Sequence, residues 1–165
     1  MPGSGKSTVG IILAKYLSFG FIDTDVLIQM NQQKSLQEIL DEGGYLNLRS
    51  IEEQEILTIN VRNHVISTGG SAVYSGKTMS YLQDISNIVF LEVDFETCRN
   101  RIHNFDTRGI AKAEDQTFLD LFHERQLLYR KYAELTVDCT IKNQEEIAEE
   151  IQRCLSLSKG DKLMM

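Results

Sequence analysis

The sequence predicts a three-layer α/β fold, in which helices cover both faces of a parallel sheet. Three observations predict it: a phosphate-binding loop at the start, short apolar stretches that alternate with helical ones, and the near-continuous apolar character of those stretches. Such runs are typical of parallel strands buried on both faces, and a βαβ series connects them by right-handed crossovers. We expect one domain over residues 1–157 and a frayed tail over residues 158–165.

The chain opens on most of a phosphate-binding loop. Residues 1–8 read MPGSGKST, which matches the end of the pattern G-x-x-x-x-G-K-[ST]. Small residues let backbone N–H groups surround phosphate oxygens, and the helical run over 6–18 points its dipole at the anion. Lys6 adds charge at the β- and γ-phosphates, and Ser7 offers its hydroxyl to Mg²⁺. The alternative is a Gly/Ser turn that opens a helix. The predicted nucleotide-binding residues of this loop are Gly3, Ser4, Gly5, Lys6, Ser7 and Thr8.

The sequence lacks two parts of the usual motif, both of which would precede Met1. These are the first glycine of the pattern and the apolar strand that feeds such a loop. We therefore expect a chain truncated at its N-terminus. The missing piece would be a central strand, and its absence should leave a slot beside the core.

The remaining elements follow from apolar patterning along the chain. Strands are expected over 20–25, 64–70, 87–93 and 135–140, and helices over 6–18, 36–41, 45–60, 96–103, 116–133 and 145–157. The segment 104–114 joins two of these helices and contains Gly109, mixed charges and no proline. We interpret this segment as a mobile lid.

Composition narrows the class of partner. The 165 residues are 42% hydrophobic and carry a net charge of −7 without a basic block, which argues against nucleic acid or an anionic membrane as partner. No apolar run approaches the ~18 residues of a membrane span, and no signal peptide is visible. Three widely spaced cysteines without C-x-x-C fit reduced thiols in a cytoplasmic protein and do not suggest a zinc site.

Polar residues and glycines follow two of the predicted strands. Asp23 and Asp25 end the strand after the loop helix, at the edge where open α/β sheets bind ligands. One carboxylate could hold Mg²⁺ through water, and the other could take a proton from an acceptor hydroxyl. The alternative for this pair is a helix N-cap. Gly69 and Gly70 follow the next strand, where they either let a ligand approach the backbone or form a plain turn.

Three arginines are further candidates. Arg49 lies three residues before Glu52 on a predicted helix, a spacing that usually means a solvated ion pair. Arg108 lies in the lid and Arg125 on the helix over 116–133. Taken singly, each arginine is more readily interpreted as a solvated surface charge, because surface ion pairs often contribute little to stability.

Taken together, these motifs resemble the shikimate kinase family. The series G-S-G-K-S-T, F-I-D-T-D, L-R-S-I-E, V-I-S-T-G-G, a lid arginine and E-R-x-x-L-Y matches in order and spacing over roughly residues 1–155. The resemblance implies a P-loop kinase fold with a five-stranded parallel sheet in the order 2-3-1-4-5. It also implies transfer of the ATP γ-phosphate to the 3-hydroxyl of shikimate, in aromatic amino-acid synthesis.

The resemblance also implies roles for residues. Asp25, Arg49, the Gly69-Gly70 backbone and Arg125 would hold shikimate. A second group would serve the nucleotide: Arg108 would close over the phosphates, Asp23 and Ser7 would serve Mg²⁺, and Arg101, Lys142 and Asn143 would lie near adenine. On this interpretation Lys6, Asp25 and Arg108 carry the catalysis, Glu52 holds Arg49 in place, and the protein is a monomer.

Several positions depart from the family pattern. They are Tyr45 for a glutamate, Ser71 for the third glycine of a G-G-G turn, Gly109-Ile110 for Pro-Leu, Leu127 for a proline, and Gln29 for a glutamate. Tyr45 and Ser71 flank the acceptor pocket, so they bear on the acceptor more than on the reaction type. The alternatives are a gluconate-type kinase of the same branch and a nucleotide-binding protein without turnover.

Overall fold

The four strands form two parallel pairs. The computed structural model describes residues 1–102, 109–113 and 115–161. In it β1 (Gly20–Asp23) pairs with β2 (His64–Ser67), and β3 (Val89–Glu92) pairs with β4 (Leu135–Asp138), each in parallel. The predicted parallel arrangement is therefore confirmed. Each strand is shorter than predicted; β1, for example, ends at Asp23 because the next residue begins a helix.

Each predicted helix is present but differs in extent, and further helices were not predicted. Their bounds are α1 (Lys6–Leu17), α2 (Thr24–Gln32), α3 (Leu36–Leu57), the 3₁₀ turn η1 (Ala72–Tyr74), α4 (Gly76–Ile85), α5 (Phe95–Arg101), α6 (Phe118–Tyr132) and α7 (Gln144–Asp161). The sequence analysis omitted α2 and α4, which side-chain caps start at Asp23 and Ser75. The two helices expected over 36–60 form one element with a kink at Gly44, whose φ is 72°. The last helix continues past its predicted end.

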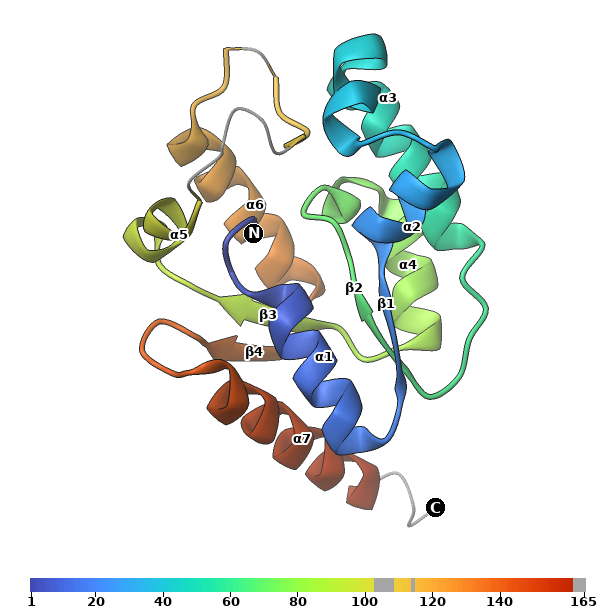
Figure 1. The fold of residues 1–165 in the computed structure, drawn as a ribbon. Helices are drawn as coiled ribbons and strands as arrows, with labels where there is room; N and C mark the ends of the chain where they lie inside the picture. The colour runs from blue at the N-terminus through green and yellow to red at the C-terminus, as the bar shows by residue number, and fades with distance from the viewer. Residues whose placement is uncertain (103–108, 114, 162–165) are drawn as a thin grey trace.

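The helices lie on both sides of the strands. Figure 1 shows α1 and α7 side by side in front of the strands, with α4 and α6 behind them. The largest buried cluster includes Val9 and Leu13 of α1, Leu91 and Val137 of the strands, and Ile151 of α7. This packing confirms the expected layered α/β arrangement and fixes the carboxyl ends of the strands near the N-terminus of α1 (Figure 1).

A cavity separates the two strand pairs. Among the described residues β2 and β3 are not paired with each other, and a cavity of about 500 Å³ touches Val65 and Ile66 of β2 and Phe90 and Leu91 of β3. The slot expected beside the core is therefore present. The order of a complete sheet is not defined by two separate pairs.

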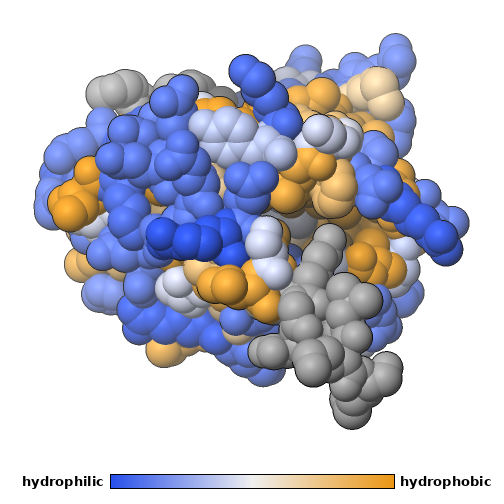
Figure 2. Space-filling view, turned by 90° about the horizontal axis from the view of Figure 1, so that it is seen from below, coloured by the Kyte–Doolittle hydropathy of each residue, from blue (hydrophilic) through white to orange (hydrophobic). Residues whose placement is uncertain are grey.

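The helices of the described residues and one face of the surface can be compared with what a membrane span requires. In the described part of the chain, no helix combines the length and apolar character that crossing a membrane requires. Figure 2 shows that the face seen from below is mostly hydrophilic, with hydrophobic residues in small groups. Large exposed apolar side chains such as Leu127 and Ile141 belong to different elements or loops.

Candidate active site

The phosphate loop has the backbone that its sequence predicts. Gly3 and Gly5 have φ values of 79° and 86°, a left-handed conformation that favours glycine. A methyl group on Gly3 would lie only 2.9 Å from the Cys98 carbonyl oxygen, so the loop also needs glycine for space. Ser4 Oγ and Lys6 Nζ both donate to the Met1 carbonyl at 2.9 Å. The loop therefore curls directly ahead of the α1 N-terminus, where the helix dipole favours an anion.

The two residues predicted to serve Mg²⁺ are in contact. Ser7 Oγ donates to Asp23 Oδ2 at 2.5 Å. Asp23 Oδ1 also accepts from the Asp25 backbone N–H at 3.0 Å, so Asp23 is the N-cap of α2, as the alternative interpretation held. Capping occupies one oxygen and leaves the other facing Ser7. Hard oxygen donors of this kind suit Mg²⁺. No cluster of three or more His, Cys, Asp or Glu among the described residues could hold a metal, so phosphate and water would have to complete the coordination.

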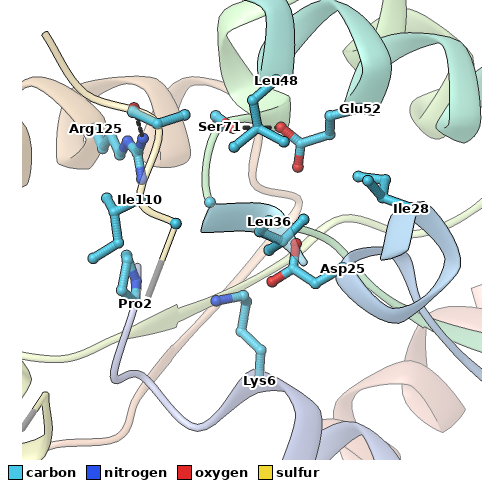
Figure 3. Close-up of a pocket in the computed structure, with 14 residues that line it drawn as sticks. Pro2, Lys6, Asp25, Ile28, Leu36, Leu48, Glu52, Ser71, Ile110 and Arg125 are labelled. Carbon is cyan, nitrogen blue, oxygen red and sulfur yellow. Dashed lines mark hydrogen bonds between the residues drawn. The ribbon is translucent and has the colours of Figure 1, made fainter. Parts of the chain in front are cut away.

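A central pocket adjoins the loop. Figure 3 shows Lys6, Asp25, Glu52 and Arg125 projecting from four different helices into one space. Its cavity volume is about 60 Å³, far smaller than the roughly 500 Å³ of the cavity between the strand pairs. The structure thus shows this pocket as narrow. The residues that line the central pocket are Pro2, Lys6, Asp25, Ile28, Leu36, Leu48, Glu52, Gly69, Gly70, Ser71, Gly109, Ile110, Ala111 and Arg125.

Two arginines meet at the Ala111 carbonyl, and one of them, Arg125, lines this pocket. Arg125 is 1% exposed, and its Nη2 donates to the Ala111 carbonyl at 2.7 Å. Arg49 Nη2 reaches the same oxygen at 3.5 Å. The Nε groups of both arginines are buried without a hydrogen-bond partner in the described structure. Burial lowers the pKa of Arg49, and the nearby Arg125 charge lowers it further. Two close guanidinium groups with spare donors form a site that suits a carboxylate.

The predicted pairing of Arg49 with Glu52 is wrong. Among the ion pairs of the described residues none joins these two side chains. The Arg49 guanidinium instead lies 3.5 Å from the ring centre of Tyr74 and 5.0 Å from that of Tyr45. Cation–π contact therefore orients Arg49. Tyr45, which departs from the family pattern, contributes to this contact.

Two carboxylates face each other across Gly69. Glu52 is 2% exposed, and Ser71 Oγ donates to its Oε2. A methyl group on Gly69 would lie 2.7 Å from Asp25 Oδ1 and closer still to Glu52 Oε1, so both carboxylates would have to move to admit it. Burial raises the pKa of Glu52 to about 7, with the Asp25 charge adding to the rise and the Ser71 hydrogen bond opposing it. This end of the pocket suits hydrogen-bond donors such as hydroxyl groups.

The two glycines after β2 are held by neighbouring elements. Gly69 N–H donates to Thr24 Oγ1 at 2.9 Å, and the Gly70 carbonyl accepts from the Tyr129 hydroxyl at 2.8 Å. These bonds connect the turn to α2 and α6. The turn is therefore a fixed part of the pocket wall.

The described part of the predicted lid is packed against α3. Gly109 N–H donates to Gln37 Oε1 at 2.9 Å, and Ile110 and Ala111 are buried. The φ of Gly109 is 66°, which proline cannot adopt, and this accounts for the departure from Pro at that position. The mobile-lid interpretation of residues 104–114 stays a prediction, and in the described part of that segment these contacts hold residues 109–111. Arg108 lies outside the described residues.

The residues expected near adenine have local structural roles. Lys142 pairs with Glu150 at 2.5 Å, and Asn143 Oδ1 caps α7 by accepting from two backbone N–H groups at 3.0 Å. Arg101 is the exposed last residue of α5, and Thr8 is exposed on α1. The structure does not bring these four into the central pocket.

Sequence analysis overlooked part of the pocket. The Ser71 hydroxyl, the Tyr74 ring and the Ala111 carbonyl were not assigned a role, and Glu52 was assigned the wrong partner. The departure at Ser71 was the available signal, since a serine replaces a glycine beside a buried acid. No local signal marks a backbone carbonyl such as that of Ala111.

Comparison with known proteins gives consistent matches. A family model described as shikimate kinase matches residues 2–156. The shikimate kinase of Caldanaerobacter subterraneus subsp. tengcongensis is 34% identical over 161 residues, which is 96% of this chain and 94% of that protein. The shikimate kinase of Rippkaea orientalis is 37% identical over 154 residues, 92% of this chain and 80% of that one.

Solved structures agree with these relatives. The Acinetobacter baumannii shikimate kinase in complex with shikimate superposes with a TM-score of 0.88 at 25% identity, covering 96% of this chain and 90% of that chain. The Aquifex aeolicus shikimate kinase gives a TM-score of 0.80 at 30% identity, covering 93% and 90%. The likeness therefore extends over nearly the whole fold.

Proposed function

Because this chain belongs to the shikimate kinase family, we infer that the central pocket is the shikimate site and that the phosphate loop holds ATP. The enzyme is a shikimate kinase, which moves the ATP γ-phosphate to shikimate. The observation that carries the site assignment is the polarity of the pocket. The Arg125 guanidinium lies at one end, where Arg49 reaches the same Ala111 carbonyl, and two carboxylates lie at the other, an arrangement that suits a hydroxylated carboxylate.

In this proposal the acceptor carboxylate binds Arg49 and Arg125. It would use their buried Nε donors and take the place of the Ala111 carbonyl as hydrogen-bond acceptor. The backbone of Gly69 and Gly70 forms the wall beside the ring. Asp25 accepts the proton of the hydroxyl that attacks the phosphate. Residues 109–111 line this narrow pocket, so we expect them to shift when the acceptor binds.

The nucleotide half of the site follows from the loop. Lys6 neutralises the transferring phosphate, and little covalent assistance is needed beyond position and charge. Ser7 and Asp23 would hold Mg²⁺, which supplies positive charge at the phosphate oxygens when bound. We place Arg108 over the phosphates, and Arg101, Lys142 and Asn143 near adenine. We also propose a single domain over 1–157 and a monomer.

Release of ADP from MgATP tests the assignment. Shikimate should support turnover, while quinate, gluconate and buffer should not. Lys6→Ala and Asp25→Asn should abolish turnover, because each removes a group worth several kcal/mol of barrier, on the order of 2.7–4 in comparable sites. Lys15→Ala is the matched control, an exposed lysine on the same helix as Lys6. Near-normal turnover of Asp25→Asn would remove Asp25 from the mechanism, and equal turnover of gluconate would reassign the acceptor.

A further inference from the structure

We propose that Tyr74 is a positioning residue for acceptor binding, because its ring holds the guanidinium of Arg49 beside that of Arg125. The inference rests on the proposed function, in which both arginines bind the acceptor carboxylate, and it adds the group that keeps them in place. Loss of the ring should therefore weaken acceptor binding and leave nucleotide binding and the transfer step unchanged.

The first step is that the ring of Tyr74 has a fixed position. Tyr74 ends η1, the 3₁₀ turn after β2, and its backbone N–H donates to the Ser71 carbonyl at 3.0 Å. The two residues before it, Ala72 and Val73, are buried in a core cluster with Ile56 of α3. The Tyr74 side chain packs against the same cluster. The turn is thus anchored in the core, and the ring cannot move far without disturbing buried contacts.

The second step is the contact between Tyr74 and Arg49. The guanidinium carbon of Arg49 lies 3.5 Å from the ring centre of Tyr74, whereas it is 5.0 Å from that of Tyr45. The face of an aromatic ring attracts a guanidinium, most strongly where both are withdrawn from water. Within the described part of the chain, no ion pair with a carboxylate involves Arg49. We therefore assign the orientation of Arg49 to Tyr74 first and to Tyr45 second.

The third step is that the same ring also faces Arg125. The guanidinium carbon of Arg125 lies 5.5 Å from the ring centre of Tyr74. Both guanidinium groups reach the Ala111 carbonyl, Arg125 at 2.7 Å and Arg49 at 3.5 Å. Burial lowers the pKa of Arg49, and the Arg125 charge lowers it further, as expected for two neighbouring cations. The electron-rich face of the ring offsets part of this repulsion and stays in place when a ligand carboxylate replaces the carbonyl.

A ring suits this role better than an acid. A carboxylate paired with Arg49 would occupy the N–H donors at the edge of the guanidinium, the same donors that a ligand carboxylate needs. A stacked ring occupies the flat face and leaves the edge free. In the described structure the Nε groups of Arg49 and Arg125 are buried without a hydrogen-bond partner. Tyr74 thus orients Arg49 without using the donors that the acceptor requires.

Steady-state kinetics with shikimate and MgATP test this role. Tyr74→Leu should raise KM for shikimate about 5- to 30-fold, the effect of losing a desolvated cation–π contact. A contact made equally with substrate and transition state changes KM alone, so kcat and KM for ATP should stay within about twofold. Tyr74→Phe keeps the ring face and should behave as the parent. Tyr45→Leu should have a smaller effect, because that ring lies further from Arg49.

The chain offers a matched control in Tyr132. It packs against the same core cluster as Tyr74, and its ring also lies near a cation, at 4.9 Å from Lys131 Nζ. Tyr132→Leu should therefore leave KM for shikimate unchanged within about twofold. Tyr74→Met keeps more of the packed volume than Tyr74→Leu and carries the same expectation, so the test does not depend on the folding of one variant.

A double-mutant cycle shows whether Tyr74 acts through Arg49. Arg49→Ala alone should raise KM for shikimate, because it removes a donor to the carboxylate. Adding Tyr74→Leu to Arg49→Ala should raise it no more than about twofold further, since the ring then has no Arg49 guanidinium to hold. A merely structural role for the ring would give the same loss in both backgrounds.

The outcomes are distinguishable. A parent-like KM for shikimate in both Tyr74→Leu and Tyr74→Met would overturn the inference and leave the kinase assignment standing. A loss confined to kcat, a loss matched by Tyr132→Leu, or equal losses with and without Arg49 would also overturn it, since each is a structural effect. No turnover of shikimate by the parent enzyme would refute the proposed function and this inference together.

Discussion

Replacing Glu52 by glutamine should stabilise the protein at alkaline pH. The pKa of Glu52 is raised by burial from 4.5 to about 7, so the folded state binds this proton more tightly than the unfolded state does. Stability from this group is fully present below the unfolded pKa and is lost as pH rises through the folded pKa. At 1.36 kcal/mol per pKa unit the loss is roughly 3 kcal/mol in total, of which about 2.5 kcal/mol falls between pH 5 and pH 8. Glutamine keeps the shape and does not titrate, so it should escape this loss.

Urea unfolding of both proteins at pH 5 and pH 8 measures the effect. The difference in unfolding free energy between variant and parent should move in favour of the variant by about 2.5 kcal/mol from pH 5 to pH 8. Taking this difference cancels the contributions of the other titrating groups to the unfolding free energy. The Glu53→Gln variant controls for removal of a carboxylate from the same helix. A difference that does not change with pH would refute the reasoning, because Glu52 would then titrate alike in the folded and unfolded states.

Three further perturbations test other parts of the structure. Arg49→Ala and Arg125→Ala should each weaken acceptor binding by about 1.5–3 kcal/mol, roughly 10- to 100-fold, with little change in the nucleotide Kd; loss of ATP affinity alone would show that the pocket is misplaced. Gly109→Pro should lower kcat/KM for the acceptor about 10- to 100-fold, since it strains the backbone and removes the donor to Gln37, with Gly109→Ala intermediate; full activity would show that the segment works in another conformation. An apolar strand of about ten residues fused ahead of the chain should fill the cavity between β2 and β3 and raise Tm by about 2–4 °C for each kcal/mol of stability gained. A Gly/Ser extension of equal length is the control and should leave Tm unchanged. Equal Tm values for the two extended proteins would count against strand insertion.

Much of the fold could be predicted because it is encoded in consecutive residues. The loop glycines and Lys6 lie within one short segment, and their backbone angles follow from residue type. The parallel strands were recognised by their apolar runs, and their pairing is confirmed. The omitted helix α2 shows the limit of this approach, because Asp23 serves as strand end, helix cap and partner of Ser7 at once.

The sequence by itself determined the phosphate loop, the parallel α/β class and the set of charged residues that could serve a kinase. Those properties depend on local spacing and on backbone preference. The tertiary structure decided which partners these residues take. Ser71 and Glu52 are 19 positions apart, and Ala111 and Arg49 are 62 apart. Such pairs form only when separate elements approach, and a small change in side-chain rotation decides whether Glu52 faces an arginine or a serine. For that reason the i,i+3 spacing of Arg49 and Glu52 gave the wrong pairing, and only the packing of α3 against the turn after β2 showed that Glu52 accepts from the Ser71 hydroxyl.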